Sequence, residues 1–522
     1  MMRLFYNPQS RGRGPKTVPT DDIIPLRFWD TALCMRGTVI DISLKFDDCL
    51  DISKIRAALD ELFKLDNWKQ VGARLREHVC DLLFAFVGLN RIRTDFISPP
   101  QNGKLEYHIP QSFDSSRPAY HFTNVEHSMN IGDHPLGKKL PQASDKPMVY
   151  GSPDEFTPLV CGVDSPTSLD DWIHSDRPQF SIHTVSFNDS TIITVTWIHT
   201  LADVMGLKIF LDAWTAMLRG DPTAVPKLED FRSDPLSLLG QRTPANKYHY
   251  YDRVFARKDF FWFIGMNILE RLWYRQEERR TICLPAASLK HLRSRAMDQI
   301  SAISPTDKES APFVSESDVL LAWWVSTVHS ALALRPDQVI LVNNALNLRT
   351  STHDAFETSE DMYMGNALCM SPTFLSGRQI SEESLGQIAL RIRESLVQQR
   401  TTEQVEAMTA LQMETMETTG YLALVGDPRM LLLSCSNWNK ARLYDMDFSS
   451  AVVRKSPSAD IDRLRAPGKP TYVNGVQHSA NSFRNVLSVK GKDSAGNWWL
   501  TGVLRTNAWK RVQAQLDMID TI

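Results

Sequence analysis

Residues 180–218 read FSIHTVSFNDSTIITVTWIHTLADVMGLKIFLDAWTAML, and this stretch decides the fold. Residues 180–197 predict a hairpin, because two runs rich in β-branched and aromatic residues flank a polar turn. From Val204 to Leu218, apolar residues recur every three or four positions, which predicts a helix. The local unit is therefore strand, short loop and helix, and His199 lies at the start of the loop.

The rest of the chain alternates between the same two patterns. The further predicted elements are strands over 38–46, 338–342 and 497–504 and helices over 52–65, 318–334 and 382–399. Interleaved strands and helices favour α/β layers. Because 522 residues exceed what one hydrophobic core usually organises, we expect two domains, residues 1–225 and 258–522, joined by a polar, proline-punctuated crossover over 226–257.

Composition and charge argue against several classes of function. Asp and Glu outnumber Lys and Arg by 61 to 58, so the net charge of −3 gives no reason to expect a nucleic acid as partner. The seven cysteines are scattered without the spacing of metal ligands, so we expect reduced thiols and no metal site. Residues 1–17 lack the apolar stretch of a secretory signal, and no uncharged apolar run reaches membrane-spanning length. We therefore expect a soluble, cytoplasmic protein.

His199 is the strongest candidate for chemistry, because a histidine just past a strand end lies at a sheet edge that a substrate can reach. Imidazole titrates near neutrality, so it can take a proton and return it. The spacing of His199 and Asp203 adds little alone, since roughly one His-x-x-x-Asp pattern is expected by chance among 13 histidines. The competing interpretation is a buried histidine that is hydrogen-bonded to a nearby carboxylate.

Several motifs accompany this pattern in a fixed order. They are Gly72-Ala73-Arg74-Leu75, His199 with Asp203 and Gly206, Val342 to Arg349 (VNNALNLR), Tyr363-Met364-Gly365-Asn366, and Trp438 nine residues before Asp447-Phe448. Together they resemble the BAHD acyltransferases, a plant and fungal family of acyl-CoA-dependent enzymes. The last motif departs from the family's Asp-Phe-Gly-Trp-Gly, because residues 447–451 read DFSSA.

The resemblance implies a two-domain, chloramphenicol acetyltransferase-like fold in which each domain is a mixed β-sheet flanked by helices. It also implies transfer of an acyl group from a coenzyme A thioester to a hydroxyl, with no tightly bound cofactor and no metal. A hydroxyl attacks a thioester poorly until a base removes its proton. His199 is the expected base, and no covalent acyl-enzyme is needed.

The resemblance also gives expected roles to other residues. Ser436, two residues before Trp438, is the expected hydrogen-bond donor to the oxyanion. Asp203 is expected to pair with Arg349 and to hold the histidine loop rigid rather than to act in catalysis. The remaining expectations are structural roles at the site for Gly206 and Asp447, contacts with substrate or coenzyme A for Trp438 and Asn366, and scaffold roles for Asp318 and Trp323.

Three functions stay open at this point. The first is acylation of a small apolar secondary metabolite, such as a terpenoid or polyketide, by a monomeric enzyme with acetyl-CoA as the simplest donor. The second is a condensation-domain relative that uses carrier-protein thioesters, although Ile198 stands where such domains commonly have another histidine. The third is a non-catalytic scaffold or binding protein descended from acyltransferases, which the altered loop after Asp447 favours.

Residues 260–274, FFWFIGMNILERLWY, are dense in aromatic side chains. Such a segment could be a lid over a lipophilic site or a helix on a membrane surface. Because it lacks a strongly basic face, we expect it to be buried near the domain interface.

Overall fold

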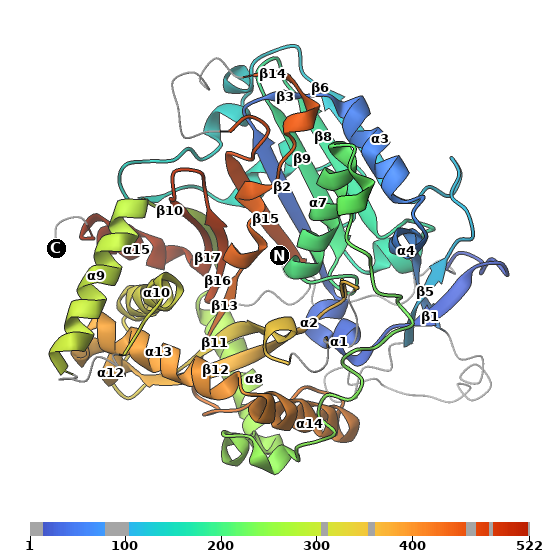
Figure 1. The fold of residues 1–522 in the computed structure, drawn as a ribbon. Helices are drawn as coiled ribbons and strands as arrows, with labels where there is room; N and C mark the ends of the chain where they lie inside the picture. Colours follow the sequence, from blue (N-terminus) through green and yellow to red (C-terminus); the bar gives the residue numbers. More distant parts are fainter. Residues whose placement is uncertain are drawn as a thin grey trace.

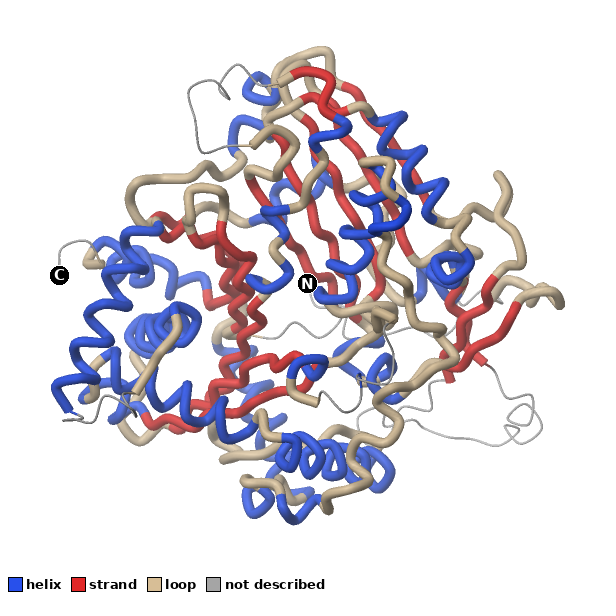
Figure 2. Tube along the Cα trace, viewed as in Figure 1, coloured by secondary structure: helices blue, strands red, loops and turns tan. Residues whose placement is uncertain are grey.

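The computed structural model describes residues 14–78, 104–303, 312–352, 356, 361–455, 466–479 and 484–519. Two large mixed sheets, each with helices on its outer face, stand side by side (Figure 1, Figure 2). This is the mixed α/β architecture expected from the sequence.

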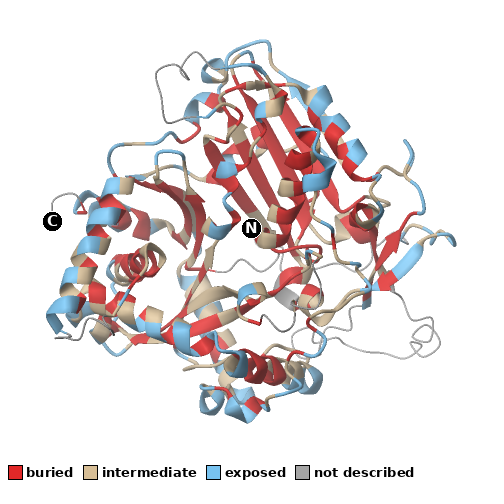
Figure 3. Cartoon of the chain, in the orientation of Figure 1, coloured by how far each residue is buried: buried red, intermediate tan, exposed pale blue. Residues whose placement is uncertain are grey.

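The first large sheet has the order β15-β2-β9-β8-β6. Its strands are β15 (Tyr472–Ser479), β2 (Thr38–Phe46), β9 (Thr191–Ile198), β8 (Phe180–Ser186) and β6 (His121–Glu126). β8 and β9 form the expected hairpin, and β2 spans the predicted residues. Helices α3 (Ile52–Leu62) and α7 (Val204–Leu218) cover one face of this sheet. Strands β2, β8 and β9 are almost wholly buried, whereas β6 at its edge is partly exposed (Figure 3).

The second large sheet has the order β12-β11-β13-β16-β17-β10-β7. Its strands are β12 (Leu368–Ser376), β11 (Val339–Asn347), β13 (Leu431–Asn437), β16 (Val486–Lys492), β17 (Trp498–Arg505), β10 (Glu277–Leu284) and β7 (Met148–Val149). Its outer face packs on α9 (Ala286–Ile303), α10 (Glu316–Leu332), α13 (Leu385–Gln399) and α15 (Trp509–Asp517). Asp318 caps the start of α10 and Trp323 is buried in this core, which agrees with scaffold roles for both.

Two strands cross the division that the sequence suggested at residues 225 and 258. β15 comes from the last tenth of the chain, yet it pairs with β2 in the first sheet. β7 comes from the first third, yet it pairs with β10 in the second sheet. The two layers therefore exchange strands, which ties them together by backbone hydrogen bonds as well as by side chains.

Two small sheets complete the strands of the described residues. One has the order β1-β5-β4, with β1 (Asp22–Pro25), β5 (Lys104–Ile109) and β4 (Arg74–His78), and the other pairs β14 (Val452–Arg454) with β3 (Cys49–Leu50). Short helices α1 (Phe28–Thr31) and α2 (Leu33–Arg36) lead into β2, while α12 (Gly377–Glu382) and α14 (Thr402–Thr419) flank α13 along the chain.

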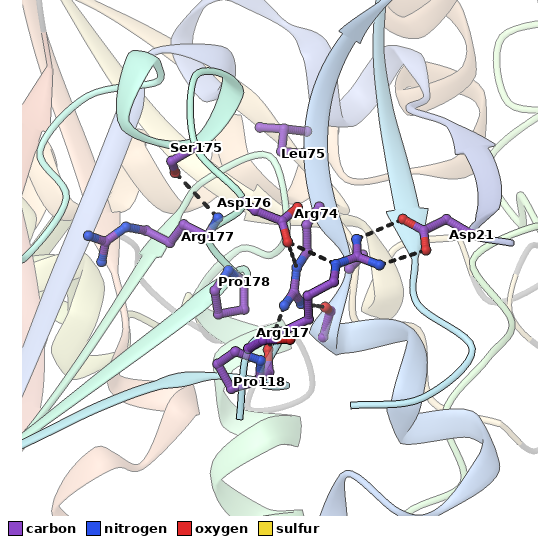
Figure 4. A network of polar contacts seen from close by, with 12 residues as sticks. Asp21, Arg74, Leu75, Arg117, Pro118, Ser175, Asp176, Arg177 and Pro178 are labelled. Carbon is purple, nitrogen blue, oxygen red and sulfur yellow. Dashed lines mark hydrogen bonds and ion pairs between the residues drawn. The ribbon is translucent and has the colours of Figure 1, made fainter. Parts of the chain in front are cut away.

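A network of arginines and aspartates fastens the small three-stranded sheet to the first large sheet (Figure 4). Arg117 donates to both carboxylate oxygens of Asp21, at 2.8 and 2.9 Å, and to Asp176 at 2.8 Å. Arg74, from the Gly72-Ala73-Arg74-Leu75 motif, is fully buried, and its Nε lies 3.7 Å from Asp176. Burial lowers the pKa of Arg74 to about 10, partly offset by the charge of Asp176. This motif therefore serves the scaffold.

Helix α8 (Arg257–Trp273) contradicts the expectation that residues 260–274 are buried. Phe263 is its one buried residue, and it packs with Leu341 of β11 and Met430. The side chains of Trp262, Leu269 and Trp273 face solvent, with exposed fractions of 57%, 60% and 82%. The prediction was wrong because aromatic density in a sequence does not say which side of a helix meets the sheet.

Candidate functional site

His199 directly follows β9, at the end of the strands of the first large sheet. Its backbone NH donates to the carbonyl of Thr38 on β2 at 2.8 Å, which is the last rung of that ladder. A turn then brings the chain to Asp203, whose carboxylate accepts from the backbone NH of Gly206 at 2.9 Å and caps α7. The strand end and the helix start therefore fix the position of the histidine from both sides.

The Nδ1 atom of His199 lies 3.0 Å from Oδ1 of Asn366. The amide nitrogen of Asn366 lies 2.8 Å from the carbonyl of His199 and 2.9 Å from Asp30 Oδ1, and both of these atoms can only accept. That amide atom must therefore be the donating NH₂ group, which leaves Oδ1 to accept from His199 Nδ1. The imidazole is held with its proton on Nδ1 and a free lone pair on Nε2, as a general base requires.

Asn366 contacts the imidazole of His199, and Asp30 in turn contacts Asn366. Asn366 is 1% exposed and its amide already contacts His199 and Asp30, whereas its expected contact with substrate or coenzyme A stays a prediction. Asp30 also accepts from the backbone NH of Asn366 at 3.1 Å, and burial raises its pKa to about 6. Sequence reasoning missed Asp30, because nothing in residues 27–31 (RFWDT) distinguishes it from a surface carboxylate.

The imidazole of His199 is desolvated, although the residue as a whole keeps some exposure. The residue keeps an intermediate exposure between the two layers. Desolvation lowers the pKa of its imidazole below the ordinary value, partly offset by its own carbonyl, Asp203 and Asn366. The ring is therefore predominantly neutral at neutral pH, which is the form that can accept a proton.

Asp203 points away from the imidazole and into a salt bridge. Its Oδ2 atom accepts from Arg349 Nη1 at 2.8 Å and from the backbone NH of Ala367 at 3.0 Å. Burial alone would raise the pKa of Asp203, but the Arg349 cation and these hydrogen bonds outweigh it and hold the pKa below its usual value. Arg349 also donates to the carbonyls of Tyr363 and Gly365. This pair joins the histidine loop to the segment that carries Asn366.

Gly206 permits a close approach between α7 and that same segment. A Cβ atom at this position would lie 2.0 Å from the carbonyl oxygen of Met364, which is backbone and cannot swing aside. The first turn of α7 can therefore rest directly on residues 363–366, as a structural role for Gly206 at the site requires.

Ser436 and Trp438 lie at the end of β13. The indole NH of Trp438 donates to Ser436 Oγ at 2.8 Å, so the serine hydroxyl keeps its own proton to donate elsewhere. Trp438 is 4% exposed, and the ammonium group of Lys490 on β16 lies 3.7 Å from its ring centroid. Trp438 thus holds Ser436, although the sequence suggested a contact with substrate.

Lys490 is a second residue that sequence reasoning missed, and no sequence signal marked it. It is 3% exposed, and burial, reinforced by the charge of Arg279, holds its pKa well below the ordinary value. A Cβ at Gly475 of β15 would lie 2.6 Å from its Nζ atom and 2.9 Å from the Trp438 ring. β15, a strand of the first large sheet, therefore packs closely against this part of the second large sheet.

Asp447 lies in the loop beside the C-terminal part of α7, and its expected structural role at the site stays a prediction. Its carboxylate accepts from the backbone NH of Ser449 at 2.9 Å, and Phe448 packs edge-on against Trp214 near the C-terminal end of α7. The positive charge of Arg219, just after α7, helps to lower the pKa of the Asp447 carboxyl group. The loop that carries Asp447 and Phe448 therefore packs against the C-terminal part of α7, and the altered motif shapes this loop.

A cavity of about 580 Å³ opens beside the histidine loop. Met205, one residue before Gly206, lines it together with Asn347 and Thr350, which flank Arg349. Residues between 439 and 445 and residues 491–493 also line it, and they carry three cations, Lys440, Arg442 and Lys492, and two carboxylates, Asp445 and Asp493. A volume of this size suits a small-molecule ligand.

Other features give context without adding a site. Among the described residues, no three His, Cys, Asp or Glu side chains are placed to hold a metal ion. The five cysteines that can be described, Cys49, Cys161, Cys283, Cys369 and Cys435, are free thiols. Within the same part of the chain, no helix has both the length and the apolar character needed to cross a membrane.

Comparison with known proteins places the chain in a family. Residues 165–456 match the model of the Transferase family. Acetyltransferase adrJ of Penicillium roqueforti is 63% identical over 502 residues, covering 96% of this chain and 97% of its own. Acetyltransferase sphE of Aspergillus fumigatus is 36% identical over 517 residues, covering 96% of each chain.

A solved structure shares the fold. The crystal structure of TRI101 from F. sporotrichioides, complexed with coenzyme A and T-2, matches 94% of this chain and 97% of its own with a TM-score of 0.60 at 17% identity. With the match over more than half of the residues and relatives at this level of identity, the chain belongs to the Transferase family and is a fungal acyltransferase of the BAHD type.

Proposed function

We propose that the protein transfers an acyl group, acetyl in the simplest case, from a coenzyme A thioester to a hydroxyl of a small apolar secondary metabolite such as a terpenoid or polyketide. One observation carries the proposal: Asn366 fixes the imidazole of His199 with its Nδ1 protonated and its Nε2 free. This proposal extends to the chain what the acetyltransferase names of its relatives and the coenzyme A in the TRI101 complex say of those proteins.

The chemistry follows from the available groups. Nε2 of His199 removes the proton of the acceptor hydroxyl as the oxygen attacks the thioester carbonyl. The tetrahedral intermediate carries an oxyanion, to which the Ser436 hydroxyl donates. As the intermediate collapses, the C–S bond breaks and the imidazolium returns its proton to the departing thiolate. The acyl group passes directly to the acceptor, so no residue of the chain is acylated.

The cavity beside the histidine loop is the proposed place for the coenzyme. Its wall carries Lys440, Arg442 and Lys492, and phosphate groups favour such cationic side chains. Arg442 already pairs with Asp445 at 2.7 Å and Lys492 with Glu316 at 2.6 Å, whereas Lys440 is exposed. We therefore assign the first phosphate contact to Lys440.

The proposal is tested by incubating the protein with several acyl-CoA species and a panel of terpenoid and polyketide alcohols while free thiol is measured. Thiol release that depends on the alcohol supports the proposal, and mass spectrometry of the product separates an ester from an amide. Absence of turnover across the panel, together with no binding of coenzyme A by calorimetry, would favour the non-catalytic alternative.

Replacing Ser436 with alanine lowers kcat by roughly 10²- to 10³-fold, because one donor to the oxyanion is lost. KM for the acyl-CoA changes little, since the donor acts mainly on the transition state. Ser434→Ala, two residues earlier on the same strand face, is the matched control. Equal losses in the two variants would mean that the strand, and not the hydroxyl at position 436, matters.

Replacing Asp30 with leucine lowers kcat by roughly 10²-fold, because Asn366 then loses the acceptor that fixes its amide and His199 can take the other tautomer. Asp30→Asn keeps an oxygen in the accepting position and restores most of the activity. The readout is kcat against KM for the leucine and asparagine variants. If Asp30→Asn loses as much activity as Asp30→Leu, the carboxylate acts by charge and not through Asn366.

A further inference from the structure

Helix α8 presents an uncovered apolar face on the outside of the protein. Two rows of exposed side chains run along it, spaced as neighbours on one side of a helix. The rows are Trp262, Met266, Leu269 and Trp273, and Phe261, Ile268 and Leu272, with exposed fractions between 42% and 82%. Gly265 lies between them, and a Cβ at this glycine would meet no atom within 4 Å. Contiguous apolar patches of this kind on a protein surface mark interaction sites.

The opposite side of α8 packs against the protein, and both acidic side chains of the helix already have partners. Phe263 and Ile264 pack with Leu341 of β11 and Leu432 of β13. Asp259 accepts from the backbone NH of Ala256 at 3.0 Å, and Glu270 pairs with Arg505 at 3.3 Å. Within residues 257–275, both acidic side chains therefore already have partners.

The charged residues that remain exposed on this segment are all positive. Arg257 and Lys258 stand at its N-terminal end and Arg275 follows its C-terminal end. The two tryptophans lie towards the ends, while Met266, Ile268 and Leu269 occupy the middle. Tryptophan prefers the boundary between lipid tails and head groups, and cations prefer the anionic head groups beyond it. An exposed side made of tryptophan and aliphatic residues, with only cations exposed at the helix ends, therefore suits the surface of an anionic bilayer.

We propose that α8 binds the surface of an anionic lipid bilayer, lying in the plane of the interface with its apolar face inserted. A second copy of the chain fits less well. Whichever way two such helices pair, their exposed ends bring only positive charges together, which opposes association. The 17-residue helix, roughly 25 Å long, lies flat in the surface and does not span the bilayer.

This placement would also bring the bilayer close to the candidate site. Leu432, which packs on the inner side of α8, and Ser436 lie on the same face of β13, because they are separated by an even number of residues. A rise of about 3.3 Å per residue puts them roughly 13 Å apart. An apolar acceptor dissolved in the bilayer would therefore leave it on the side of the second sheet that carries Ser436. The binding itself does not depend on the proposed reaction.

The test is sedimentation of the full chain with vesicles made of equal parts phosphatidylcholine and phosphatidylserine, beside vesicles of phosphatidylcholine alone. We expect the wild type to sediment with the anionic vesicles and to be released by high salt. Leu269→Glu/Trp273→Glu should weaken this binding by more than roughly tenfold. Arg257→Glu/Lys258→Glu should weaken binding to anionic vesicles by roughly tenfold or more.

The matched control is Val163→Glu/Leu238→Glu, which adds the same charge at exposed apolar residues elsewhere, with exposed fractions of 105% and 59%. It should bind vesicles as the wild type does, and equal thermal midpoints show that all variants are folded. An equal loss in this control overturns the proposal, because general charge would then explain it. Failure of the wild type to sediment also overturns it. A dimer by light scattering that becomes a monomer in Leu269→Glu/Trp273→Glu, without vesicle binding, replaces the bilayer with a second copy.

Turnover keeps the two proposals separate. Leu269→Glu/Trp273→Glu should turn over a water-soluble alcohol as the wild type does, because α8 contributes no side chain to the base or to the oxyanion donor. Loss of vesicle binding with intact turnover therefore tests the proposal for α8 alone. Loss of turnover in a His199→Gln variant tests the proposed reaction alone.

Discussion

His199→Gln lowers turnover by roughly 10²- to 10⁴-fold, because the amide that replaces the imidazole cannot take the acceptor's proton. Coenzyme A binding by calorimetry should be unchanged, since His199 does not line the cavity whose wall carries Lys440. Wild-type kcat/KM should rise with pH through a pKa below the ordinary value of about 6.5, where the imidazole loses its proton, and level off above it. The variant should lack this rising limb.

The matched control is His329→Gln on α10, a histidine whose pKa burial also lowers but which belongs to the outer layer. It should retain turnover and its pH profile. Retention of turnover in His199→Gln would refute the base and return the non-catalytic alternative, or a different base, to first place.

Asp203→Asn destabilises the fold by about 3 to 5 kcal/mol, because it leaves the Arg349 guanidinium without its carboxylate in a buried position. Arg349→Met/Asp203→Asn should be less destabilised than the sum of the two single variants, since the double variant removes both charges. Denaturant unfolding of the four proteins measures this coupling. Additive losses would mean that the two residues do not interact in solution.

The same pair predicts a dependence of stability on pH. The pKa of Asp203 is depressed in the folded state, so its contribution is complete above the unfolded value near 4 and is lost as pH falls through the lower folded value. The wild type should therefore lose stability below about pH 4 more steeply than Asp203→Asn. Thermal midpoints over the acid range compare them, and parallel curves would exclude Asp203 as the source.

Local patterns in the sequence predicted several elements of the fold. The spacing of apolar residues predicted α7 and β2 with their observed bounds, and predicted the β8–β9 hairpin. It also placed His199 at the strand end. These features depend on backbone propensity and on which side of an element is apolar, and both properties are written in consecutive residues.

Contacts between residues far apart in the sequence could not be predicted from such local patterns. Asp30 lies behind Asn366 although 336 positions separate them, and Lys490 packs on Trp438 from the neighbouring strand β16. β15 joins a sheet whose other strands all come from the first two fifths of the chain. Such pairings depend on how strands are ordered in a sheet, which no local pattern records.

Sequence by itself determined the α/β class, the motif around His199 and the pairing of Asp203 with Arg349, the last through resemblance to a family. Tertiary structure alone decided which nitrogen of the imidazole is free, that Asn366 and Trp438 contact other side chains, that the loop of Asp447 packs on α7, and that the aromatic helix faces outward. The physical reason is that a sequence fixes the chemistry of each side chain and the periodicity of its element. Hydrogen-bond direction, burial and exposure depend instead on partners that folding brings from far along the chain.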